Sequence, residues 1–227
     1  MTKEEVKLRQ RYLNSLGANL VVDGIIGPKT LAAEAKYAKP LPTPVITPKN
    51  YFGAPWIGAN IDLLGRHESD AKLNERYVPE WRLEGLPGYK TLVGNTHAWC
   101  SVKVNADLRK VGVKGTNSAG ASSWSSWGRK CPFWFGCVLD IRHKSGGRHV
   151  AFFLYWIDEA KGLAAVYGGN QGNRMSIVSQ TINQKADSLV TGPRWSKDQP
   201  DGQFVSKTEV LKAYPLLKVG GVAGSTR

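Results

Sequence analysis

The feature that most constrains how this chain can fold is a proline-rich stretch at residues 39–50. It contains Pro40, Pro42, Pro44 and Pro48, at near-alternate positions. Proline fixes the backbone and has no N–H to donate, so neither a helix nor a central strand can continue through this stretch. An extended, semi-rigid linker is therefore expected. The chain is predicted to form two units, a small module at residues 1–38 and a larger domain at residues 51–227.

Composition narrows the class of protein. The chain has 227 residues, of which 41% are hydrophobic, and a net charge of +13. That hydrophobic content supports a folded core and argues against wholesale disorder. The charge favours a polyanionic partner, either nucleic acid, an anionic membrane surface or an anionic cell-wall polymer. Charge alone does not choose among the three.

The sequence carries no sign of secretion or of a membrane span. The N-terminus, MTKEEVK, lacks the apolar core of a signal peptide, so synthesis in a cytoplasm is expected. The longest apolar run, residues 150–157, is too short to cross a bilayer, so no membrane insertion is expected.

The cysteines do not form a recognisable metal or redox motif. Cys100, Cys131 and Cys137 are an odd set, and no two of them have the C-x-x-C spacing. Cys131 and Cys137 are interpreted as packing residues. No metal and no cofactor are predicted.

The first unit is expected to be two helices, over residues 3–16 and 28–38, joined by a turn at Asp23-Gly24. The segment VDGIIGPKT, residues 22–30, together with LRQRYLNSLG, residues 8–17, resembles the small helical peptidoglycan-binding domain of many cell-wall hydrolases. The resemblance implies a peptidoglycan partner. The alternative is a helical hairpin that serves another partner or caps the fold.

The candidate nucleophile is Cys100. The segment THAWCSVKVNADL, residues 96–108, passes from polar to amphipathic, which predicts a helix from about Cys100 to Lys110. A thiol in the first turn of a helix lies near unpaired N–H groups and the positive end of the helix dipole, which favour the thiolate. The alternative is a small buried side chain with no reactivity, as most free cysteines are.

The second half of the chain reads as β-structure. Residues 149–157 are predicted to form a strand covered on both faces, and residues 163–167 the strand that returns from a hairpin loop. Further strands are expected at residues 133–142 and 175–179. A helix is expected at residues 56–64, and turns without a helix at residues 65–95. The predicted class is α+β, with the helix that bears Cys100 packed on an antiparallel sheet.

The hairpin brings an amide side chain close to His149. If Ile157 pairs with Leu163, His149 lies opposite Gln171, and if the loop is one residue tighter it lies opposite Asn170. An amide beside the imidazole can fix its tautomer. The register cannot be decided from the sequence. A cysteine at a helix start, a histidine at a strand start and an amide orienter are the parts of a catalytic triad.

Several segments resemble, in order and spacing, the CHAP domains (cysteine, histidine-dependent amidohydrolase/peptidase). They are residues 96–115, 124–128, GRHVAF at 147–152 and VYGGNQ at 166–171. The resemblance implies a papain-like core, with Cys100 as nucleophile, His149 as general base and Asn170 as third residue, Gln171 being the substitute. Two features depart from the family. Gly136 is followed by Cys137 rather than by an acid, and no acidic calcium-binding loop is present.

The two resemblances together imply a modular bacteriophage endolysin. Such a hydrolase would stay in the host cytoplasm until release and then cut an amide bond in the cell wall, as an amidase or an endopeptidase. A monomer is expected. No motif supports nucleic-acid binding. The alternative is a non-catalytic wall-binding or phage structural protein with a degenerate CHAP fold.

Overall fold

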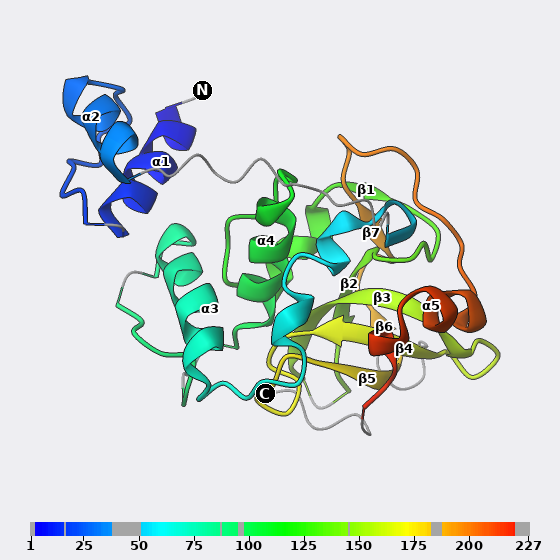
Figure 1. Cartoon of the computed structure of the whole chain (residues 1–227). Coiled ribbons are helices and arrows are strands. Elements are labelled where there is room, and N and C mark those ends of the chain that lie inside the picture. The colour runs from blue at the N-terminus through cyan, green and yellow to red at the C-terminus, as the bar shows by residue number, and fades with distance from the viewer. Residues whose placement is uncertain are drawn as a thin grey trace.

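The structure is a computed structural model of the whole chain (Figure 1). It describes residues 3–15, 17–37, 51–86, 88–94, 98–144, 146–182 and 188–220. The expected linker at residues 39–50 lies outside the described residues. The helices are α1 (Lys3–Ser15), α2 (Pro28–Tyr37), α3 (Ala71–Leu83), α4 (Cys100–Lys110) and α5 (Lys207–Ala213). Single-turn 3-10 helices are η1 (Tyr51–Gly53), η2 (Pro55–Ile57), η3 (Ile61–Leu63) and η5 (Pro215–Leu217), and η4 (Ala121–Ser126) is longer.

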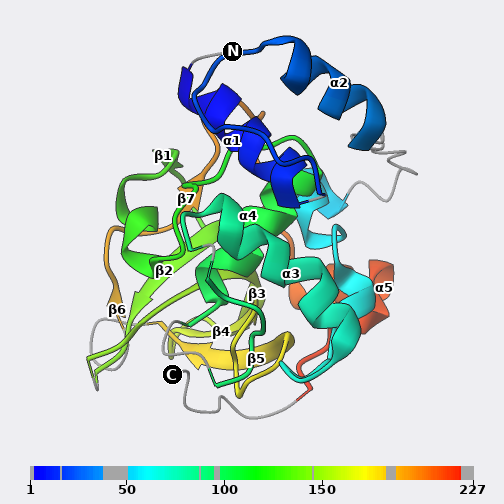
Figure 2. The same cartoon turned by 90° about the vertical axis from the view of Figure 1, so that its left-hand side faces the viewer.

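The N-terminal unit is the expected pair of helices, held by one buried amide. Gln10 on α1 donates to Asp23 Oδ1 at 2.7 Å and to the Ile25 carbonyl at 2.9 Å, and accepts from the Gly24 N–H at 2.9 Å. One side chain thus fixes the whole turn that leads to α2. The pair adjoins the rest of the molecule where α1 contacts α3 (Figure 2).

Two expectations for residues 51–95 are wrong. Residues 56–64 form the short helices η2 and η3 rather than one helix. Residues 71–83, expected to be turns, form the 13-residue helix α3. Asp70 caps its start, since its carboxylate accepts from the N–H groups of Lys72 and Leu73. Pro79 lies inside the helix without ending it.

The strands form one antiparallel sheet. They are β1 (Arg129–Lys130), β2 (Val138–Arg142), β3 (Arg148–Asp158), β4 (Leu163–Gly168), β5 (Ser176–Thr181), β6 (Ser188–Leu189) and β7 (Arg194–Trp195). Their order is β1-β7-β2-β3-β4-β5, and β6 pairs with β2. The strand expected at residues 133–142 begins only at Val138, because Gly136 adopts a φ of 81° in a turn. The α+β class is confirmed.

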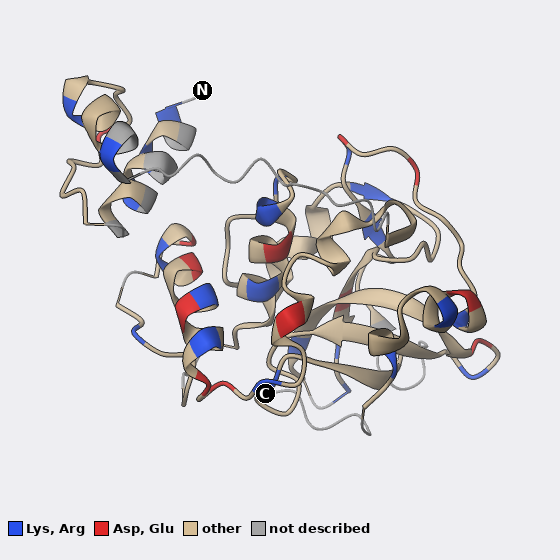
Figure 3. Cartoon of the chain, in the orientation of Figure 1, with Lys and Arg blue, Asp and Glu red and all other residues tan. Residues whose placement is uncertain are grey.

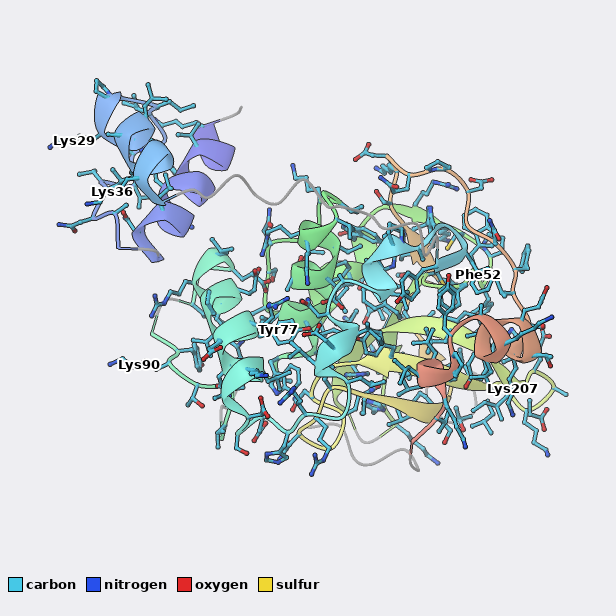
Figure 4. All side chains as sticks on the ribbon, in the orientation of Figure 1. Lys29, Lys36, Phe52, Tyr77, Lys90 and Lys207 are labelled. Carbon is cyan, nitrogen blue, oxygen red and sulfur yellow. The ribbon has the colours of Figure 1, made fainter. Side chains whose placement is uncertain are left out.

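The central strand β3 is packed against helices along its length. Its residues 149–155 are buried. The α4 side is closed by Lys103, whose ammonium lies 4.4 Å from the ring centre of Phe152 and 3.3 Å from that of Tyr167. Tyr77 of α3 reaches into the same layer (Figure 4). The elements that carry the candidate site, α4, β3 and the end of β4, are therefore fixed by the core.

Basic side chains are spread over the molecule. Figure 3 places Lys and Arg on α2, α3, α4 and α5, so the positive charge is not confined to one element. Within the described ranges, no helix combines the length and apolar character needed to cross a membrane.

Candidate active site

Cys100 occupies the first position of α4, as expected. Trp99 precedes it as N-cap, and among the described residues no side-chain capping hydrogen bond is made at this helix start. The first-turn N–H groups are therefore left for another acceptor. The backbone of Val150, the residue after His149, helps to lower the pKa of the Cys100 thiol, so the thiol lies close to β3.

The expectation that the helix start favours the thiolate is wrong for this conformation. Burial raises the pKa of Cys100 to about 11, and hydrogen bonds from the backbone of Val150, Ser101 and Cys100 itself offset only part of that rise. The side chain is 1% exposed. Loss of hydration therefore outweighs the helix start, and Cys100 is a thiol at neutral pH.

His149 is the second residue of β3 and is equally buried. Burial lowers its pKa to about 4, opposed by the hydrogen bond with Gln171 and assisted by His143 and Lys103. The His149 and His143 rings stack with their centres 6.2 Å apart. The imidazole is therefore neutral at pH 7, the form that can accept a proton.

Gln171 orients the imidazole and defines its tautomer. Gln171 Nε2 donates to the Ser176 carbonyl at 2.7 Å, which leaves Oε1 as an acceptor, 3.2 Å from His149 Nε2. His149 Nε2 must then carry the proton, and Nδ1 is the basic nitrogen. An orienting amide beside His149 was predicted, and its geometry suits a histidine that acts as a base.

The structure places Gln171, the substitute, against His149 rather than Asn170, the residue preferred from the resemblance. The pairing of Phe152 with Tyr167, if continued, would put Asn170 opposite His149. However, β4 ends at Gly168 and the chain turns sharply, with φ values of 60° at Asn170 and 62° at Gly172. The turn brings the next side chain, Gln171, to the imidazole. The register between β3 and β4 therefore does not decide which amide side chain contacts His149.

The two glycines before Asn170 leave room for different neighbours. A Cβ at Gly168 would lie 3.1 Å from His149 Nε2 and 3.0 Å from the Gln171 side chain. A Cβ at Gly169 would lie 2.4 Å from the ring of Trp99. Gly168 thus admits the imidazole–amide pair, and Gly169 lets the start of α4 approach the end of β4.

Cys100 and His149 adjoin the same end of β3, but no hydrogen bond joins their side chains. Regular pairing with β2 puts His149 on the side of β3 opposite Phe152, the residue that contacts α4. Arg148 lies on the same side as Phe152. Arg148 therefore lines the same cavity as Cys100, whereas His149 lies on the other side of β3.

A cavity of about 490 Å³ is lined in part by Cys100. Its lining is mostly small: Glu84, Leu86, Ala98, Cys100, Ser118, Ala119, Gly120, Ala121, Ser122 and Arg148. The wall at Ser118 is tied to α4, because Ser101 Oγ and Asn105 Nδ2 donate to the Ser118 carbonyl at 2.6 and 3.0 Å. This wall of the cavity is therefore held in place relative to Cys100.

Two charged residues of this cavity, Glu84 and Arg148, were not predicted as site residues. Arg148 adjoins His149 in the sequence, which was a usable signal. Glu84 follows α3, a helix that was not predicted, so nothing placed it near Cys100. No group of three or more His, Cys, Asp or Glu residues arranged to hold a metal occurs among the residues described.

Comparison of the chain with protein families, curated proteins and solved structures finds no match.

Proposed function

We propose that this protein is a cysteine-dependent peptidoglycan hydrolase that cuts an amide bond, as a muramoyl-peptide amidase or as a peptide endopeptidase. The observation that carries the proposal is Cys100, which begins α4, lies close to the strand that bears His149 and lines a cavity. The resemblance to CHAP domains and to a wall-binding module supports the same reaction and substrate.

The reaction begins with a neutral thiol and a neutral imidazole. His149 Nδ1 takes the proton from Cys100, and the sulfur attacks the amide carbonyl. N–H groups in the first turn of α4 stabilise the oxyanion. His149 then protonates the leaving amine, and water releases the acyl group. Because no hydrogen bond joins the two side chains before substrate enters, substrate binding must bring the imidazole and the thiol together.

The remaining features fit a wall substrate. The N-terminal helix pair has an apolar, exposed surface that includes Val21 and Ile25. A net charge of +13 favours anionic wall polymers by long-range attraction. Anchoring and catalysis on one chain would raise the local concentration of substrate at the site.

The decisive experiment compares Cys100→Ala with Cys131→Ser on purified sacculi. The rate of appearance of new amino groups should fall at least about 1,000-fold in Cys100→Ala, since the nucleophile is lost. Cys131→Ser removes a thiol outside the site and should match the wild type. Mass spectrometry of the products then identifies the bond. Full activity of Cys100→Ala would refute the proposal.

One observation favours a second candidate, a non-catalytic wall-binding protein. Cys100 is 1% exposed and held as a thiol, as an inert packing cysteine would be. This candidate predicts that the wild type sediments with sacculi but releases no amino groups. The same assay therefore separates the two functions.

A further inference from the structure

Glu84 is a buried carboxyl group beside the candidate nucleophile. It follows α3 directly as its C-cap and lines the cavity that Cys100 also lines. Neither carboxyl oxygen makes a well-formed hydrogen bond to a described residue, and no cation contacts them there. Burial raises the pKa of Glu84 to about 8, and a weak side-chain interaction with Asn105 opposes only part of that rise. A buried carboxyl without a partner is costly, and such groups occur where a ligand completes them.

The preceding turn of α3 carries a glutamate that does have a cationic partner on α4. Glu80, four residues earlier on α3, forms a salt bridge with Arg109 of α4. Four residues back along α4, beside Glu84, stands Asn105. Asn105 is already engaged, with Nδ2 on the Ser118 carbonyl and Oδ1 accepting the Thr116 N–H at 2.8 Å. The α3–α4 contact therefore supplies a cation to Glu80 and none to Glu84.

The other charge in the cavity does not neutralise Glu84. Arg148 binds Asp140 through Nε and Nη2, and its Nη2 also donates to Ser125 Oγ at 2.6 Å. The guanidinium is thus matched by its own carboxylate. Glu84 also lies at the C-terminal end of a 13-residue helix, where the helix dipole favours a positive charge. Because Arg148 is paired with Asp140 and the end of α3 favours positive charge, the cavity near Glu84 favours a bound cation.

We propose that Glu84 binds a primary ammonium group of the substrate, next to the amide bond that Cys100 attacks. This inference rests on the proposed function and specifies its substrate as a peptide with a free amine, such as a diamino-acid side chain or an uncapped N-terminus. The ammonium supplies three N–H donors to the two buried carboxyl oxygens. Binding draws the proton from Glu84, so the pair forms as carboxylate and ammonium.

A first experiment uses untreated sacculi and sacculi whose free amines have been acetylated. Wild type should release new amino groups about tenfold faster from the untreated material, since a desolvated charge pair is lost on acetylation. In Glu84→Gln, which keeps the shape and removes the charge, the ratio should fall to about one. Glu159→Gln, at an exposed site, should keep the wild-type ratio.

A second experiment needs no hydrolysis. Cys100 is modified at pH 8.5 with the cationic reagent 2-aminoethyl methanethiosulfonate or the neutral methyl methanethiosulfonate, and peptide mapping follows its rate of disulfide formation. The cationic-to-neutral rate ratio should drop about tenfold in Glu84→Gln. Intrinsic fluorescence at the same pH confirms that the variant is folded.

Either of two results overturns the inference: equal wild-type rates on the two kinds of sacculi, or an unchanged reagent ratio in Glu84→Gln. These failures differ from failure of the proposed function. If Cys100→Ala is inactive while Glu84→Gln keeps both ratios, only the ammonium site is refuted. If Cys100→Ala is active, the hydrolase mechanism is refuted, and the reagent ratio still reports on Glu84.

Discussion

Asp107 on α4 and Glu84 at the end of α3 are both buried acids, but only Asp107 has a cation against it. Lys103 Nζ lies 2.8 Å from Asp107 Oδ2, and Asp107 Oδ1 accepts from Asn60 and from Tyr77 at 3.2 Å. Burial lowers the pKa of Lys103 to about 8, and Asp107 works against that shift. Among the described residues, Glu84 has no comparable group of a cation and hydrogen-bond donors around it. An acid held against a cation in the core serves the fold, while an acid in a cavity with no cation against it is available to a ligand.

The largest change in stability is expected when the ion pair between Lys103 and Asp107 is broken. Lys103→Met leaves Asp107 buried without its cation, which should lower the free energy of unfolding by about 3–5 kcal/mol. Urea denaturation followed by tryptophan fluorescence measures this. The double variant Lys103→Met/Asp107→Leu should recover most of the loss, because both charges are gone. If Lys103→Met were as stable as the wild type, the proposed difference between the surroundings of Asp107 and of Glu84 would be refuted.

A smaller effect is expected at the amide that orients His149. Gln171→Ala frees the imidazole to rotate and should lower kcat/KM on sacculi by about 10- to 100-fold. Asn170→Gly is the matched control, since glycine keeps the positive φ found there. It should stay within about threefold of the wild type. A larger loss of kcat/KM in Asn170→Gly than in Gln171→Ala would assign the orienting role to Asn170.

The smallest effect is a gain in stability when the unpaired acid is neutralised. The pKa of Glu84 is about 8 in the fold against an ordinary value of 4.5. As pH rises from 4.5 to 8, the unfolded chain ionises at this residue while the fold holds the proton, so the wild type loses stability. Glu84→Gln does not titrate. Its advantage should be near zero at pH 4.5 and on the order of 2 kcal/mol at pH 8.5.

The control for that gain is Glu80→Gln, one turn away. It breaks the salt bridge with Arg109, whose pKa burial lowers to about 10. This variant should be less stable than the wild type, because a partly buried guanidinium loses its partner. Chemical denaturation of both variants in the same buffers tests whether their effects have opposite signs.

The sequence predicted the helix at Cys100 and the β3–β4 hairpin because each has strong periodicity and a clear boundary. It did not predict α3, whose interior proline and polar residues favour turns. Asp70 as a cap, with Leu73, Tyr77 and Trp81 at intervals of four, was the available signal. Missing α3 also meant missing Glu84.

Two other features depend on the folded molecule rather than on local sequence. The choice of Gln171 over Asn170 follows from positive φ values after β4, which strand pairing does not encode. The thiol form of Cys100 follows from burial by distant segments, whereas the helix start alone favours the thiolate.

The glycines at 168 and 169 limit how this chain can diverge. Gly169 faces the indole of Trp99, so any side chain there would displace the start of α4. Gly168 faces the imidazole–amide pair, so a side chain there would disturb that pair while leaving Trp99 in place. A descendant protein that had lost catalysis could accept other residues at position 168. It would still require glycine at position 169.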